Sequence, residues 1–212
     1  MTTHQKMPIG YYAGIAIMLL RGVIYFLLRL RLPRRVVMDR GARIRGIGNI
    51  EFRGWTKIGA NALLDARYCD RVVLGPRFSL GDHSVMRCSG SPLFICPGVT
   101  IGTDVSFGPF CNIGGGFGLV IGDENIFGPY VSIHPETHVV ADLDRPIRQQ
   151  GVAGKGIAIG ADNWFGAKAT VLDGSVIGAS NIVAAGAVVT PGDHGSLRIL
   201  GGMPVRQLGK RS

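Results

Sequence analysis

Apolar residues recur every six positions through most of this chain. Steps of six taken from Ile159 meet only apolar side chains, at Ile159, Phe165, Val171, Ile177, Val183 and Val189. With 46% of residues apolar, chance produces such a run in roughly one register in a hundred. Shorter runs with the same spacing start at Leu74, Ile95 and Ile121. A period of six matches neither the 3.6-residue turn of an α-helix nor a simple two-residue strand alternation.

A small residue commonly follows the apolar one, as at Gly160, Gly166, Gly178 and Ala184. Such residues suit sharp corners of the backbone. The apolar residue then points inward on every side of a solenoid, and stacked coils share one continuous core. We therefore expect a β-solenoid over residues 44–206. Because 17% of the 212 residues are charged and the 33 glycines have no three-residue period, disorder and collagen are excluded.

The positive charge is concentrated at the N-terminus. Residues 1–43 hold eight Lys or Arg and one acid, a net +7, out of +9 for the whole chain. The remaining residues carry only +2, whereas a nucleic-acid groove would need its charge on the folded body. No nucleic-acid partner is expected. The four cysteines form no CxxC pair and are predicted to be buried thiols of a reducing compartment.

The N-terminal segment 1–43 is apolar and basic. No charged residue occurs from Met7 to Leu20, and Arg21, Tyr25 and Arg29 then recur at four-residue spacing. This pattern favours an amphipathic helix in a membrane surface, with contacts from residues 7–35. A single transmembrane span and a helix packed on its own oligomer remain alternatives. No signal-peptide cleavage site follows, and Pro33 is expected to end the helix.

The longest interruption of the six-residue pattern is a polar stretch. Ile133 and Ile159 are 26 positions apart, which is not a multiple of six, and the loop 134–156 between them contains His134 and His138. Loops ejected from a regular scaffold commonly serve binding or catalysis. A neutral imidazole, with an ordinary pKa of about 6.5, can act as a general base at neutral pH. Glu136, Asp142 and Asp144 are each candidates to orient the imidazole.

Three motifs carry a resemblance to a known family: I121-G-D-E-N-I-F-G, I159-G-A-D-N-W-F-G and V176-I-G-A-S-N-I-V-A-A-G-A-V-V-T. The chain resembles the hexapeptide-repeat acyltransferases over roughly residues 44–206, most clearly from 121 to 206. The resemblance implies a left-handed parallel β-helix of triangular section, a homotrimer and acyl-CoA as co-substrate. The fold class expected is all-β: a left-handed parallel β-helix with an N-terminal membrane-associated helix and a basic tail at 207–212.

The resemblance also assigns roles to residues. His138 matches the catalytic histidine of the maltose and galactoside acetyltransferase branch, although Val139 stands where proline is usual. His134, Asn112 and Trp164 are expected to contact substrate. The residues expected to bind the cofactor are Gly166, Ala167, Ala184, Ala185, Gly186, Thr190 and Arg206.

Pro191 replaces the lysine that often follows Thr190 in the family, so Arg198, Arg206 or Lys210 is expected to meet the CoA phosphate instead. The ending G201-G-M-P-V-R206 matches the family's closing motif. No metal is expected, because a zinc site of the carbonic anhydrase type needs three histidines and only His134 and His138 are close.

The function expected from this resemblance is an acetyl-CoA-dependent O-acetyltransferase. Its acceptor would be a sugar hydroxyl, free or on a lipid-linked glycan, in bacterial exopolysaccharide, capsule or O-antigen synthesis. The N-terminal segment places it at the cytoplasmic face of the inner membrane. The alternatives are acetylation of a small soluble acceptor (serine, an antibiotic or an amino sugar), a carbonic anhydrase and a non-catalytic scaffold.

Overall fold

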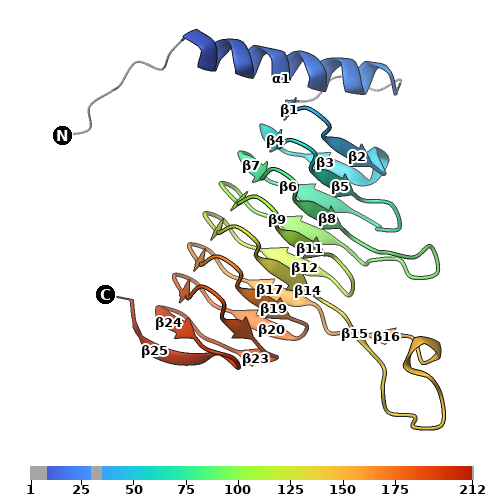
Figure 1. Cartoon of the computed structure of the whole chain (residues 1–212), viewed down its shortest axis with the longest axis vertical. Coiled ribbons are helices and arrows are strands. Elements are labelled where there is room, and N and C mark those ends of the chain that lie inside the picture. Colours follow the sequence, from blue (N-terminus) through green and yellow to red (C-terminus); the bar gives the residue numbers. More distant parts are fainter. Residues whose placement is uncertain (1–8, 30–34, 212) are drawn as a thin grey trace.

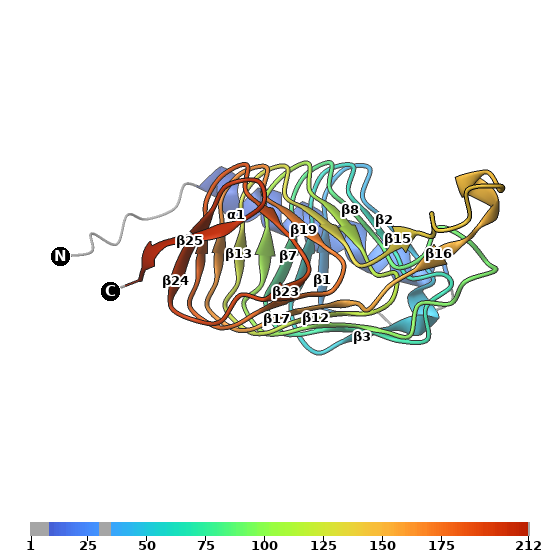
Figure 2. The same cartoon turned by 90° about the horizontal axis from the view of Figure 1, so that it is seen from below.

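The computed structural model describes residues 9–29 and 35–211. Most of the chain winds into stacked coils, each of which crosses three parallel sheets in turn (Figures 1 and 2). Sheets A, B and C form the three sides of a prism, an arrangement typical of the left-handed β-helix. The all-β solenoid predicted from the six-residue period is confirmed.

Sheet A consists of β1 (Val36–Met38), β4 (Thr56–Ile58), β7 (Phe78–Leu80), β10 (Ser106–Phe107), β13 (Ile126–Phe127), β18 (Trp164–Phe165), β21 (Ile182–Val183), β24 (Arg198–Gly201) and β25 (Arg206–Lys210). Sheet B consists of β2 (Arg43–Arg45), β5 (Leu63–Asp65), β8 (Val85–Arg87), β11 (Asn112–Gly114), β14 (Ser132–His134), β19 (Thr170–Leu172) and β22 (Val188–Val189).

Sheet C consists of β3 (Ile50–Phe52), β6 (Val72–Leu74), β9 (Val99–Ile101), β12 (Leu119–Ile121), β17 (Ile157–Ile159), β20 (Ser175–Ile177) and β23 (Gly192–Asp193). Two short 3-10 helices occupy Ile47–Asn49 and Ile147–Gln149. β25 pairs antiparallel with β24, so the expected basic tail at 207–212 begins inside a strand.

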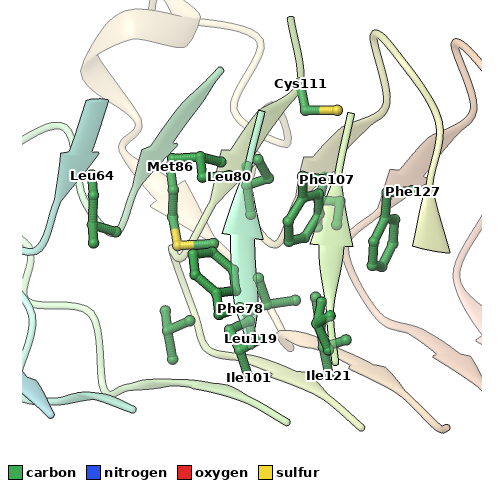
Figure 3. Packing of buried hydrophobic residues seen from close by; sticks show 14 of the residues in the cluster. Leu64, Phe78, Leu80, Met86, Ile101, Phe107, Cys111, Leu119, Ile121 and Phe127 are labelled. Atoms are coloured by element: carbon green, nitrogen blue, oxygen red, sulfur yellow. The ribbon is translucent and has the colours of Figure 1, made fainter. Parts of the chain in front are cut away.

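The core is a column of inward-pointing apolar residues, as the repeat predicted, except that Ile95, the first residue of one run, is 48% exposed. Phe107, Phe127 and Phe165 follow one another on sheet A with ring centroids 4.3 and 4.5 Å apart, and each is at most 3% exposed. Figure 3 shows the first two of these rings. Stacking of equivalent residues from successive coils removes their apolar surface from water, the main favourable term in folding. All four cysteines are buried and free, as expected.

An asparagine ladder runs inside the later coils. The Asn125 side-chain oxygen accepts hydrogen bonds from the backbone N–H and the side-chain amide of Asn163, both at 3.0 Å. Asn163 in turn accepts from the backbone N–H of Asn181 at 2.8 Å. All three are at most 1% exposed, and their amides donate to corner carbonyls. The ladder thus satisfies backbone groups that would otherwise be buried without a partner.

Close stacking of coils explains the small corner residues. A Cβ added to Gly166 would lie 2.5 Å from the backbone nitrogen of Ala185 and 2.9 Å from its Cα, on the next coil. Backbone atoms cannot move aside as a flexible side chain could. Glycine at this corner is therefore a packing requirement of the solenoid, whatever else the corner binds.

Helix α1 (Ile9–Leu27) lies across the first coil (Figure 1). The Tyr25 hydroxyl donates to the carbonyl of Ile44 at 2.5 Å and accepts from its N–H at 2.8 Å, and Arg21 pairs with Asp39 at 3.1 Å. Arg21 and Tyr25 of the predicted polar stripe therefore contact the β-helix, and the apolar Phe26 beside them is 2% exposed and packs on Phe52. Arg29, the third residue of the stripe, is exposed and donates to the carbonyl of Tyr25. Within residues 9–29 and 35–211, no helix has the length and hydropathy of a membrane span. The helix ends at Leu27, and Pro33 lies outside the described residues.

Candidate active site

The loop 134–156 leaves the β-helix at the corner between sheets B and C and projects away from it (Figures 1 and 2). Its root is an antiparallel pair of strands, β15 (Thr137–His138) and β16 (Val152–Ala153). At the returning end, the Asp173 carboxylate accepts hydrogen bonds from the backbone N–H groups of Lys155 and Gly156, at 2.8 to 3.0 Å. The loop is therefore anchored to the next coil by a carboxylate clamp.

The outer part of the loop is also ordered internally. The Gln150 side chain accepts from the backbone N–H of Asp142 at 3.0 Å and donates to the carbonyls of Asp142 and Arg145, at 2.7 and 2.8 Å. The Asp142 carboxylate accepts from the N–H of Asp144 at 3.0 Å. The Asp142 carboxylate, one of the candidates to orient the imidazole, is thus part of the loop's own folding.

His138 is exposed at the end of β15, opposite Val152. Within the described part of this single chain its imidazole has no hydrogen-bond partner, and none of Glu136, Asp142 and Asp144 is bonded to it. An accessible imidazole on an anchored hairpin has room for an acceptor hydroxyl on one ring nitrogen. The group that would fix its tautomer is not supplied by the carboxylates expected from the sequence.

His134 lies at the end of β14, on the outer face of sheet B. Its Nε2 is 2.6 Å from the hydroxyl oxygen of Ser132. Asn112 is the cross-strand neighbour of Ser132 on one side, and Thr170 on the other. The structure therefore brings together two residues predicted from the sequence, His134 and Asn112. It adds Ser132 and Thr170, whose only sequence signal was a polar residue just before the inward apolar position.

A groove of about 540 Å³ lies beside the returning end of the loop, along the outer face of sheet C. Its floor is the cross-strand row Thr100, Val120, Ala158 and Val176. Lys155, in the loop's returning end, also lines it. This mainly apolar groove could hold an extended, narrow ligand. None of the site residues predicted from the sequence lies in a strand of sheet C.

The predicted cofactor residues lie elsewhere in the same chain. Gly166 and Ala167 follow β18, and the stretch 184–186 follows β21, so both sets lie at the corner between sheets A and B. The loop instead leaves the corner between B and C. Trp164 is on the outer face of sheet A, 53% exposed between Ile126 and Ile182 of neighbouring strands. One chain therefore does not bring the two halves of the predicted site together.

The remaining predicted residues are near the C-terminus. Thr190 follows β22 at the corner between sheets B and C, where its carbonyl accepts a hydrogen bond from Ser175 at 3.0 Å. Arg206 opens β25 opposite Gly201. Arg198 and Lys210 face each other across the β24–β25 pair and line a cavity of about 280 Å³. In residues 9–29 and 35–211, no cluster of three His, Cys, Asp or Glu could hold a metal ion.

Comparison with known proteins extends this picture. No family model matches the chain. A probable acetyltransferase of Mycobacterium tuberculosis is 26% identical over 163 residues, which are 77% of this chain and 48% of that protein. The carnitine operon protein CaiE of a Proteus species is 30% identical over 116 residues, 52% of this chain and 57% of that protein. The chain thus spans about half the length of the curated relatives it matches.

Among solved structures, the chain is similar to a mutant of AntD, an N-acyltransferase from Bacillus cereus, in complex with dTDP and coenzyme A. The TM-score is 0.56 at 18% identity, and the match covers 84% of this chain and 81% of AntD. Another AntD mutant, in complex with dTDP-4-amino-4,6-dideoxyglucose and coenzyme A, matches with the same TM-score at 19% identity. At these identities, the comparison establishes that the two proteins share a fold.

Proposed function

We propose that this protein transfers an acetyl group from acetyl-CoA to the hydroxyl of a sugar, with His138 as the general base. The observation that carries the proposal is the exposed His138 imidazole on a clamped hairpin, rooted between the polar patch around His134 and the groove on sheet C. The similarity to a probable acetyltransferase of M. tuberculosis and to AntD, an N-acyltransferase, supports the reaction class. Coenzyme A in the AntD complexes supports the acyl donor.

The proposed chemistry needs one proton carrier. Neutral imidazole takes the proton of the acceptor hydroxyl as its oxygen attacks the thioester carbonyl. The tetrahedral intermediate then collapses, the carbon–sulfur bond breaks, and the departing thiolate takes the proton from the imidazolium. His134, hydrogen-bonded to Ser132, and the neighbouring Asn112 are proposed to bind the sugar.

We place the complete site between two chains of a homotrimer. The hairpin lies at the corner between sheets B and C, whereas the small residues 166–167 and 184–186 lie at the corner between sheets A and B. A site that uses both sets needs a second chain to supply one wall. The sheet C groove is proposed to hold the pantetheine arm on the hairpin's side. Thr190, Arg206 and the pair Arg198 and Lys210 are proposed to contact the nucleotide end of the donor.

The N-terminal helix is proposed to hold the protein at a membrane surface. A row of side chains along α1 is apolar and 46 to 59% exposed: Ile17, Leu20, Ile24 and Leu27. Because Tyr25 and the buried Phe26 dock the helix on the first coils, this apolar row is the side left outward. Leu20→Glu together with Ile24→Glu should abolish sedimentation with anionic vesicles, and unchanged sedimentation would reject this role.

A panel assay tests the reaction. Release of free CoA thiol from acetyl-CoA is measured with hexoses, amino sugars, sugar nucleotides and serine as acceptors. Turnover that requires a sugar and is lost in His138→Ala supports the proposal. Turnover with serine alone would favour a small soluble acceptor, and absence of turnover and of acetyl-CoA binding would favour a scaffold.

N-acylation of an amino sugar is a second candidate, favoured by the likeness to AntD and its complex with an amino-sugar nucleotide. The two products differ chemically, because an ester is cleaved by mild alkali or hydroxylamine and an amide is not. Mass spectrometry of the product before and after hydroxylamine treatment therefore separates O-transfer from N-transfer.

A further inference from the structure

Three arginines surround one buried carboxylate on the outer face of sheet B. Asp65 is 1% exposed, and both of its oxygens accept hydrogen bonds from the Arg67 side chain, at 2.9 and 2.8 Å. Arg45 and Arg87 are its cross-strand neighbours on either side. Their guanidinium nitrogens lie 3.8 and 3.9 Å from the same carboxylate, beyond hydrogen-bond distance.

The three arginines around Asp65 carry more positive charge than is needed to pair with its carboxylate. Arg67 alone supplies the hydrogen bonds that the buried carboxylate requires, so Arg45 and Arg87 add a surplus charge of +2. Their side chains are 44 and 49% exposed. Asp65 is also the only acidic residue in the seven strands of sheet B. Two half-exposed guanidinium groups held near a buried carboxylate have donors left to offer an anion.

The arginines lie in line with the predicted sugar contacts. Arg87 is opposite Gly114 on β11, and β11 pairs in register with β14, so Gly114 is beside His134. Because Gly114 has no side chain, no side chain lies between those of Arg87 and His134. Two strand spacings, roughly 10 Å, therefore lie between the backbones of Arg87 and His134. A sugar whose hydroxyl is at His134 would direct a phosphate on its far end toward Arg87.

We propose that Arg45 and Arg87 bind a phosphate or diphosphate carried by the acyl acceptor, which makes the acceptor a glycosyl phosphate ester. The inference rests on the proposed function for the acceptor's sugar. Guanidinium groups form paired, charge-assisted hydrogen bonds with phosphate oxygens. Such an acceptor has two sources, a soluble sugar nucleotide or a lipid-linked glycosyl diphosphate.

A matched control is present on sheet C. Glu51 accepts from Arg53 at 2.8 Å and from Arg71, so both of these arginines are hydrogen-bonded to their acid and the cluster has a surplus of only +1. The double variant Arg53→Gln and Arg71→Gln removes the same charge as Arg45→Gln and Arg87→Gln. It leaves sheet B untouched.

Calorimetric titration of the full chain with inorganic pyrophosphate, and sedimentation with phosphatidylcholine vesicles containing phosphatidylglycerol, test the site without turnover. We expect pyrophosphate affinity to fall at least 10-fold in the Arg45/Arg87 double variant and to change less than 2-fold in the Arg53/Arg71 variant. A loss confined to the anionic vesicles would favour the lipid-linked source, and a loss confined to pyrophosphate would favour the soluble one. Equal losses in both double variants, or no loss in either assay, would overturn the proposal.

The anion site and the proposed reaction can be rejected independently of each other. Asp65 keeps its bonds to Arg67 in the Arg45/Arg87 variant, so thermal unfolding should be close to that of the wild type. If the chain is an active transferase, the variant should raise KM for a phosphorylated acceptor and leave kcat and the KM for acetyl-CoA unchanged. Arginine-dependent pyrophosphate binding without any transferase activity would keep the anion site and reject the reaction.

Discussion

The Asp173 carboxylate is 2.8 Å from the backbone nitrogen of Gly156 and accepts its hydrogen bond, which joins the returning end of the loop to the corner after β19. The neighbouring N–H of Lys155 donates to the same carboxylate. One side chain thus fixes the point at which the chain re-enters the solenoid. His138 pairs with Val152, three residues before Lys155, so its position depends on this clamp.

Asp173→Ala should loosen the hairpin without unfolding the coils. A displaced general base commonly costs roughly 10- to 100-fold in turnover. We also expect faster tryptic cleavage at Arg148, which lies in the exposed loop. Limited proteolysis and thermal unfolding measured together check this, since a lower melting temperature without faster loop cleavage would show that Asp173 supports the coil rather than the loop.

His138→Ala should lower turnover by about 10²–10⁴-fold, the usual contribution of a general base. His138 is exposed, so the fold should persist. His83→Asn is the matched control: His83 is also exposed, and asparagine tolerates its backbone φ of 58°. Thiol release at saturating acetyl-CoA measures both. Equal activity of the two variants would remove His138 as the base.

Gly166→Ala should destabilise the protein by about 1–3 kcal/mol, the usual cost of overpacking. The added methyl group would lie 2.5 Å from the Ala185 backbone. Gly90→Ala is the control, because a Cβ at that position meets no atom within 4 Å. Urea unfolding measures the difference. If Gly166→Ala is as stable as the control and loses only CoA binding, the glycine serves the cofactor and not the stacking.

Asp65 should contribute stability that disappears in acid. Burial raises the pKa of this carboxyl, but hydrogen bonds from Arg67 and the charges of Arg67 and Arg45 outweigh that effect, so the pKa lies below its ordinary value of 3.8. A lowered carboxyl pKa stabilises the folded state above pH 3.8 and loses that effect as the pH falls further.

Thermal unfolding of the wild type and of Asp65→Asn checks this directly. At neutral pH the variant should be less stable by about 1–3 kcal/mol, the usual worth of hydrogen bonds to a buried charged group. The gap should narrow as the pH falls through the acid range. A gap that does not depend on pH would mean that the packing of Asp65, not its charge, is what matters.

The period of six was enough to predict the solenoid, because an inward apolar residue on each face is the condition for stacking coils. All six apolar residues met in steps of six from Ile159 to Val189 are buried. The asparagine ladder was not predicted. Asn125, Asn163 and Asn181 are spaced 38 and 18 residues apart, and only the three-dimensional stack shows that each bonds the next.

The sequence also did not predict which side of α1 packs on the β-helix. The spacing of Arg21, Tyr25 and Arg29 identified one polar side of the helix, but which side meets the protein depends on partners 18 and 19 residues away, Asp39 and Ile44. Likewise, the loop and its histidines were evident from the break in the repeat. The groove on sheet C was not, because its floor is assembled from outward residues of four separate strands.

The most direct test of a catalytic site shared between chains is complementation between two inactive variants. His138→Ala lacks the base, and Ala185→Trp fills the wall at the corner between sheets A and B, where Ala185 is exposed. The two variants are refolded separately and together, and thiol release is measured. A shared site predicts that the mixture regains activity, because some mixed trimers contain one intact cleft. A mixture as inactive as its components, or a fully active wild-type monomer in sedimentation, would contradict it.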